Sequence, residues 1–148
     1  MRRTLVAVAV VALATGCGGR KERLTQVEFA QRGNGICREL FAKLNALPQA
    51  KSAPALVDVM ERARADTEGA LDRLDDLRPP EAREQAFEQF LDRIRDEAAL
   101  TKEVQSAAEE KDLRRALRVA NRGVVLDREA HAAAGRAGLA GCARRARR

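Results

Sequence analysis

Apolar residues recur at alternating steps of three and four along most of the chain, a spacing that places side chains on one face of an α-helix. The pattern predicts four helices, over about residues 26–47, 53–77, 81–110 and 113–142. Only short polar or proline-containing segments separate them. Because such connections make consecutive helices antiparallel neighbours, we expect an all-α fold, an antiparallel up-down-up-down four-helix bundle.

Local signals support these helix boundaries. Thr25 and Glu28 have the spacing of a capping box, and Ser52 is a candidate cap for the second helix. Two prolines at positions 79–80 end that helix, because proline has no amide proton to continue the hydrogen-bond ladder. A two-residue break before residue 113 predicts a very tight turn between the third and fourth helices.

We expect one face of each helix to be buried in the core. In the first helix that face contains Val27, Ala30, Asn34, Cys37, Phe41 and Leu44. In the fourth helix it contains Leu113, Leu117, Ala120, Val124, His131 and Ala134. Gly33 and Gly35 flank Asn34, and each costs about 1 kcal/mol relative to alanine in a helix interior. A kink or a close helix approach is therefore expected at these glycines.

The N-terminal segment differs from the rest of the chain. After Arg2 and Arg3, an apolar run from Leu5 to Ala14 has about half of the roughly 20 residues that a membrane-spanning helix needs. Such a segment, followed by small residues, has the form of a secretory signal. Ala14-Thr15-Gly16-Cys17 resembles the lipobox of bacterial lipoproteins, whose cysteine carries a diacylglyceryl group. The alternative is ordinary cleavage that leaves Cys17 as a free thiol.

These features predict a signal peptide over residues 1–16, a tether over 17–23, a helical domain over 24–142 and a basic tail over 143–148. Because two or more lipid chains hold a protein stably at a bilayer, the membrane is the expected partner of Cys17. We therefore expect an exported protein that is lipid-anchored at the outer face of the cell membrane.

With Cys17 lipidated, Cys37 and Cys142 remain, and in an exported protein they should pair. The bridge would close almost the whole domain, and a loop of that size contributes about 4 to 5 kcal/mol in the chain-entropy model. We therefore expect one disulfide to be a main element of the framework.

A straight bundle makes this pairing difficult. At about 1.5 Å rise per residue, a straight fourth helix would carry Cys142 toward the start of the first helix, beyond Cys37. Either the fourth helix ends early, at Gly135 or Gly138, and the chain folds back, or the helices are tilted or broken near Gly33 and Gly123.

Three short motifs span nearly the whole exported chain. They are Asn34-Gly35-Ile36-Cys37, Leu77-Arg78-Pro79-Pro80 and Gly138-Leu139-Ala140-Gly141-Cys142. The pattern resembles a group of small exported helical proteins and lipoproteins of high-GC Gram-positive bacteria. The resemblance implies a disulfide between Cys37 and Cys142 on a helical bundle, and it implies no established activity.

Few residues of this chain point to catalysis or to a metal. His131 is the only histidine, and an isolated histidine on a helix is usually a packed or surface side chain. The paired Glu-x-x-His motifs of di-metal bundles are absent, as are a glycine-rich phosphate loop and metal-spaced cysteines. We therefore expect no catalytic residue, no metal site and no cofactor. Asn34 should make a buried hydrogen bond that fixes helix register, and a ligand contact is the alternative.

The net positive charge of the chain lies at its ends, because residues 17–143 carry equal numbers of basic and acidic side chains. Of its 28 basic residues, which compare with 22 acidic ones, two lie in the signal peptide and four in the tail, namely Arg144, Arg145, Arg147 and Arg148. A free arginine tail would be attracted to anionic lipid or to cell-wall polymer. The alternative is a solvated chain end, and export argues against nucleic acid as the partner.

Two functional hypotheses follow. In the first, the protein is a non-catalytic envelope lipoprotein whose bundle is a binding or interaction module for an unknown ligand or envelope protein. In the second, it handles a small molecule, haem or a metal in a pocket between the helices around Asn34 and His131. A haem would require His131 to face Met60 across the bundle.

Overall fold

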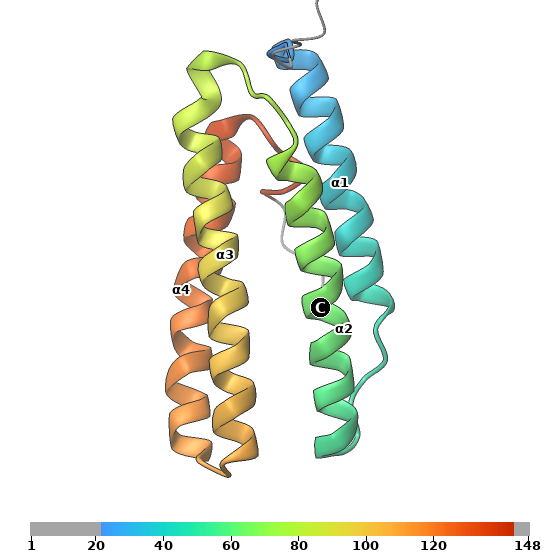
Figure 1. Cartoon of the computed structure of the whole chain (residues 1–148), viewed down its shortest axis with the longest axis vertical. Coiled ribbons are helices and arrows are strands. Elements are labelled where there is room, and N and C mark those ends of the chain that lie inside the picture. Colours follow the sequence, from blue (N-terminus) through green and yellow to red (C-terminus); the bar gives the residue numbers. More distant parts are fainter. Residues whose placement is uncertain (1–21, 144–148) are drawn as a thin grey trace, which may run out of the picture.

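The computed structural model describes residues 22–143, which form four α-helices and, over that range, no strand. The helices are α1 (Gln26–Ala46), α2 (Ala53–Asp75), α3 (Glu81–Glu109) and α4 (Leu113–Ala137). Each helix packs beside the next one in the chain. Figure 1 shows the α2–α3 connection at one end of the molecule and the other two connections at the opposite end. The all-α prediction is confirmed, and the helix pairing is consistent with a four-helix bundle.

The predicted helix starts are confirmed at the level of hydrogen bonds. The Thr25 hydroxyl accepts from the Glu28 amide, and the Glu28 carboxylate accepts from the Thr25 amide at 3.0 Å, which completes the capping box. Ser52 caps α2, and the Asp112 side chain accepts from the Arg115 amide at 2.9 Å to cap α4. Each cap satisfies amide groups that a helix start otherwise leaves unpaired.

The predicted tight turn before α4 is also present. Lys111 has a positive φ of 60° in this turn, and the two helices that it connects form the most extensive helix pair. Leu100 and Ala107 of α3 and Val119 of α4 are buried along this pair. The α3–α4 pair is therefore packed along much of its length.

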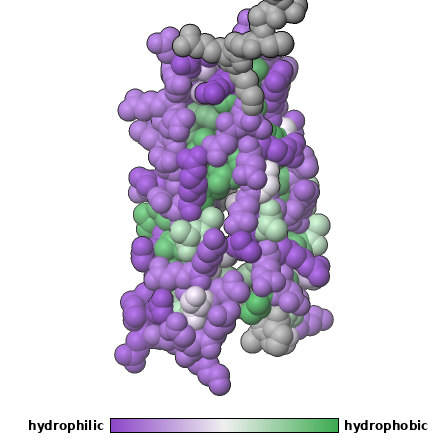
Figure 2. Space-filling model, viewed as in Figure 1, coloured by the Kyte–Doolittle hydropathy of each residue, from purple (hydrophilic) through white to green (hydrophobic). Residues whose placement is uncertain are grey.

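The main hydrophobic core lies in the half of the molecule that contains the α2–α3 connection. It is formed by most of α1, the second half of α2, the first half of α3 and the second half of α4. At its centre the rings of Phe29 and Phe87 meet edge to face, with centroids 5.0 Å apart. Figure 2 shows hydrophilic side chains over most of the viewed face and hydrophobic residues between the helices. The buried hydrophobic residues are therefore concentrated toward one end of the long axis.

The buried face of α1 differs from the predicted one. Its buried residues are Phe29, Gly33, Ile36, Cys37 and Leu40, whereas Val27 is 65% exposed. The predicted face was wrong at its start because α1 turns Phe29 toward the ring of Phe87 on α3. Later along the predicted face, Cys37 is buried in the core, and Phe41 and Leu44 are partly buried and pack against it.

The predicted face of α4 is confirmed at one end and wrong at the other. Ala134 is fully buried, but Leu113 is 72% exposed, Leu117 is 58% exposed and Val124 is 52% exposed. No Cα atom of α1 lies within 8 Å of a Cα atom of α4, and both helices are described in full. The first half of α4 consequently has no α1 helix to cover its apolar side.

A short C-terminal segment, residues 138–143, closes the gap between α1 and α4 at the core end. Helix α4 ends at Ala137, and Gly138 adopts the left-handed conformation with a φ of 85°. The chain then folds back, and Cys142 forms the predicted disulfide with Cys37, with Cα atoms 5.1 Å apart. Of the two geometric alternatives, the early end of the fourth helix is therefore the correct one.

The close approach predicted near Gly33 involves this segment and not another helix. A Cβ atom on Gly33 would lie 2.6 Å from Leu139 Cδ2, whereas a Cβ on Gly35 would meet nothing within 4 Å. Leu139 is fully buried. Helix α1 continues through both glycines without a break, and Leu139 occupies the space that a side chain at position 33 would need.

Candidate functional site

Asn34 makes a hydrogen bond, as predicted, but the bond joins α1 to the segment after α4 and not to another helix. Its side-chain oxygen accepts a hydrogen bond of 2.6 Å from the amide of Gly141, in the segment that carries Cys142. The contact is partly buried, and it holds the C-terminal segment against α1 near the disulfide. Asn34 does not line the cavity that contains His131, so the structure does not bring these two candidate ligand contacts together.

A cavity of about 200 Å³ lies between the two helix pairs, beside the disulfide. All four helices contribute to it, together with the C-terminal segment. Its lining consists of Cys37, Leu40, Phe41, Leu44, Thr67, Ala70, Leu71, Leu74, Phe90, Ile94, Glu97, Asp127, Ala130, His131 and Cys142. Most of these side chains are apolar. The cavity exists because α1 and α4 do not pack directly against each other, and the segment with Cys142 fills only one end of the space between them.

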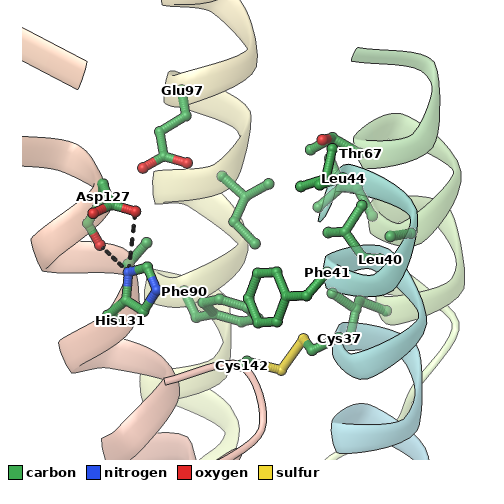
Figure 3. Close-up of a pocket in the computed structure, with 15 residues that line it drawn as sticks. Cys37, Leu40, Phe41, Leu44, Thr67, Phe90, Glu97, Asp127, His131 and Cys142 are labelled. Atoms are coloured by element: carbon green, nitrogen blue, oxygen red, sulfur yellow. Dashed lines mark hydrogen bonds and ion pairs between the residues drawn. A yellow bond between two sulfur atoms is a disulfide. The ribbon is translucent and has the colours of Figure 1, made fainter. Parts of the chain in front are cut away.

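Three ionisable side chains face the cavity. Figure 3 shows Glu97 on α3 and Asp127 on α4 away from the disulfide, with His131 lying between Asp127 and the level of Cys142. The labelled rings of Phe41 and Phe90 lie closer to the disulfide. The cavity is therefore apolar at the disulfide end and polar toward its other end.

The hydrogen bonds of His131 define its tautomer. Its Nδ1 atom contacts the backbone carbonyl of Asp127, one turn earlier in α4, and lies 3.2 Å from the Asp127 carboxylate. A carbonyl oxygen only accepts hydrogen bonds, so Nδ1 carries the proton. In the neutral ring Nε2 is then an acceptor, and this atom is buried with no hydrogen-bond partner among the described residues.

Glu97 is the second side chain with an unsatisfied buried atom. Its Oε1 atom has no hydrogen-bond partner within residues 22–143. Burial, and to a lesser degree the negative charge of Asp127, raise the pKa of Glu97 from 4.5 to about 7. Two buried acceptors without partners in one cavity require an explanation, and a ligand with hydrogen-bond donors would provide one.

The thiol and hydroxyl side chains of the cavity lining are already engaged. Both cysteines in its lining are joined in the disulfide, and the Thr67 hydroxyl donates to the carbonyl of Ala63 at 2.8 Å. In the described part of the chain, no group of three or more His, Cys, Asp or Glu side chains is arranged to hold a metal ion.

Sequence reasoning identified His131 but missed the two carboxylates near it. Asp127 precedes His131 by one helical turn, a spacing that places both on one face. Glu97 lies between Ile94 and Ala98, two apolar residues whose spacing places them on one face of the third helix. The available signal was a charged residue beside an apolar helix face. In most helices a residue in that position is exposed to solvent at the edge of the face, so the signal does not indicate burial.

Several predicted site residues lie outside the described range. These are Cys17, expected to carry lipid, and the tail residues Arg144, Arg145, Arg147 and Arg148. Within residues 22–143, no helix is both long and apolar enough to span a membrane. Comparison of the chain with protein-family models, curated proteins and solved structures found no match.

Proposed function

We propose that this protein is a lipid-anchored, non-catalytic binding protein of the cell envelope, and that its helical domain holds a small apolar molecule between the helices. The observation that carries the proposal is the apolar cavity whose lining includes two buried acceptors without partners, Glu97 Oε1 and His131 Nε2. Cavities of this kind, apolar with a few convergent polar groups, are typical of small-molecule sites.

The cellular address in this proposal comes from the sequence. Ala14-Thr15-Gly16-Cys17 supports a lipid anchor, and the resemblance to small exported helical lipoproteins agrees with it. The arginines of the tail would add attraction to anionic lipid or cell-wall polymer near the membrane. An envelope protein that docks on the bundle is the other partner class consistent with a non-catalytic domain.

The binding proposal is tested on the full chain carrying Cys17→Ala, so that no attached lipid competes for the cavity. Two probes, 1-naphthylmethanol and 1-naphthylmethylamine, are titrated by their fluorescence. Ala130→Leu should abolish binding, because Ala130 lines the cavity and is buried. Ala132→Leu is the matched control, since Ala132 is an exposed residue of the same helix.

Circular dichroism is used to check that each variant is folded. If Ala130→Leu does not fold, Ala70→Leu replaces it, because Ala70 lines the same cavity from α2. Binding of at least one probe that is lost on filling the cavity and kept in Ala132→Leu supports the proposal. Binding of neither probe, or binding that survives the filling of the cavity, would show that the domain is not a small-molecule carrier of this kind.

The anchor is tested separately in a bacterial host that processes lipoproteins. Wild-type protein should incorporate labelled palmitate and remain with the membrane fraction, and Cys17→Ala should lose the label and be released or remain unprocessed. A Cys17→Ala protein that stays in the membrane fraction at the normal mature mass would contradict lipidation at this cysteine.

A further inference from the structure

We propose that the cavity recognises a lipophilic amine, a molecule with an apolar body and a protonated primary amine as its head. This inference rests on the proposed binding function and names the ligand class of the same cavity. It places the amine near Glu97 and His131 and the apolar body against the rings and aliphatic side chains toward the disulfide.

The hydrogen-bonding groups of the cavity call for a donor. His131 Nε2 is an acceptor, because Nδ1 carries the proton that it shares with Asp127. The ionised Glu97 carboxylate is likewise an acceptor. Its Oε1 atom and His131 Nε2 are both buried without partners among the described residues. A primary ammonium ion offers three donors and no acceptor, which matches a polar end whose unpaired groups are acceptors. Hydrogen bonds between ionised groups are also the stronger ones.

The charge of the cavity selects the sign of the ligand. Its lining contains two carboxylates, Glu97 and Asp127, and neither an arginine nor a lysine. A carboxylate or phosphate ligand would meet like charges in a partly desolvated space, whereas a cation would relieve their mutual repulsion. The absence of a metal-binding group of side chains among residues 22–143 favours an organic cation over a metal ion.

The size and lining of the cavity define the apolar body. A volume of about 200 Å³ exceeds the roughly 150 Å³ of an engineered apolar cavity that holds benzene. Phe41 and Phe90 line the apolar part, and aromatic rings pack favourably against a flat ring system. A fused pair of rings with one aminomethyl group therefore matches both the apolar volume and the polar end.

Three probes of nearly equal size separate these contributions: 1-naphthylmethylamine, 1-naphthylmethanol and 1-naphthoate. Titrations of the full chain carrying Cys17→Ala are made at pH 8, where Glu97 is mostly ionised and the amine is still protonated. We expect the amine to bind at least tenfold more tightly than the alcohol, and the carboxylate to bind most weakly. Glu97→Gln should reduce the affinity of the amine to that of the alcohol and change the alcohol by less than threefold.

Glu103→Gln is the matched control, because Glu103 lies on the same helix, pairs with Arg122 and does not line this cavity. It should leave the preference for the amine unchanged. Glu97→Leu serves as a second variant if Glu97→Gln does not fold, since leucine also removes the charge and suits an apolar lining.

The outcomes distinguish the ligand class from the binding function itself. If the alcohol or the carboxylate binds as tightly as the amine in a cavity-dependent way, the domain binds small molecules but the amine assignment is wrong. The assignment is also wrong if the preference persists in both Glu97 variants. If none of the three probes binds, both the amine assignment and the proposed binding function are wrong.

Discussion

At the scale of single residues, Glu97 shows how one buried carboxylate relates to both stability and binding. Its side chain lines the cavity between the two helix pairs, close enough to Asp127 for the two charges to interact. Burial penalises the charged form, and the pKa rises from 4.5 to about 7. Ionisation of Glu97 in the empty cavity therefore opposes folding.

We predict that this carboxylate makes the free energy of unfolding fall as the pH rises from about 5 to 8. In the unfolded chain Glu97 ionises near 4.5, whereas in the folded chain it keeps its proton up to about 7, so the folded state binds more protons between these values. The loss should be about 1 to 2 kcal/mol after partial exposure of the side chain is considered. Urea unfolding of wild type and Glu97→Gln at four pH values measures it.

Glu97→Gln should flatten this decline, so that the stability difference between variant and wild type grows with pH. Carboxylates that other residues stabilise in the folded state, such as Glu28 and Glu39, have lowered pKa values and act at more acid pH. They cancel in the comparison of the two proteins. A difference that stays constant from pH 5 to 8 would mean that Glu97 titrates normally in the folded state.

Gly33 and Gly35 form a natural pair for a second prediction. Gly33→Ala should destabilise the protein by about 1 to 3 kcal/mol, because its Cβ would collide with the buried Leu139. Gly35→Ala should stabilise it by roughly 1 kcal/mol, since alanine is the better helix former and its Cβ meets nothing within 4 Å. Chemical denaturation measures both. Equal effects of the two substitutions would contradict the packing of Leu139 on α1.

At the scale of elements, α4 combines two different environments along one helix. Its second half buries Ala130, Ala133, Ala134 and Ala137 in the core. Its first half exposes leucine and valine side chains on the apolar side, where α1 does not reach. Small alanines allow the C-terminal segment and the neighbouring helices to approach the second half closely, so the stability of α4 is provided unequally by its two ends.

The same substitution at two leucines should reveal this difference. Leu117→Ala on α4 should change stability by no more than about 0.5 kcal/mol, because the side chain is already 58% exposed. Leu91→Ala on α3 should cost about 2 to 5 kcal/mol, because Leu91 is only 2% exposed in the core. Urea unfolding at one pH compares them. A large loss from Leu117→Ala would show that the first half of α4 is covered in solution.

At the scale of the whole molecule, the C-terminal segment acts as a closure between helices that do not otherwise meet. The disulfide ties it to α1 across 105 residues of sequence, the Asn34 side chain bonds the Gly141 amide, and Leu139 occupies the space beside Gly33. These three contacts join the two ends of the domain. The cavity lies beside this closure, so the covalent framework and the candidate site share Cys37 and Cys142.

Removal of the disulfide should therefore lower stability by about 4 kcal/mol, the size expected for a loop of roughly 100 residues. Cys37→Ser, Cys142→Ser and the double variant should be alike, because each removes the same bridge. Thermal unfolding followed by circular dichroism measures the loss, and mass spectrometry after denaturation should find no free thiol in the Cys17→Ala protein. Strictly additive effects of the two single variants, or two free thiols, would contradict the bridge.

Several parts of this structure could be predicted from local sequence. The capping box at Thr25 and Glu28, the cap at Ser52 and the two prolines after α2 define helix ends through interactions within a few residues. The cysteine count predicted the disulfide, and the conflict between that bridge and a straight fourth helix left Gly138 as one of the possible helix ends. These predictions succeeded because chain connectivity and short-range hydrogen bonding are written in consecutive residues.

The orientation of the helices about their axes and the location of the cavity were decided by the tertiary structure. Periodicity placed Leu113, Leu117 and His131 on one face of α4, but it could not indicate which part of that face another helix would cover. The answer depends on how far apart α1 and α4 lie. At the core end, the C-terminal segment with Leu139 occupies the space between them. Glu97 became a partly buried carboxylate with one unsatisfied oxygen only because side chains from distant parts of the chain surround it, and no local pattern encodes that desolvation.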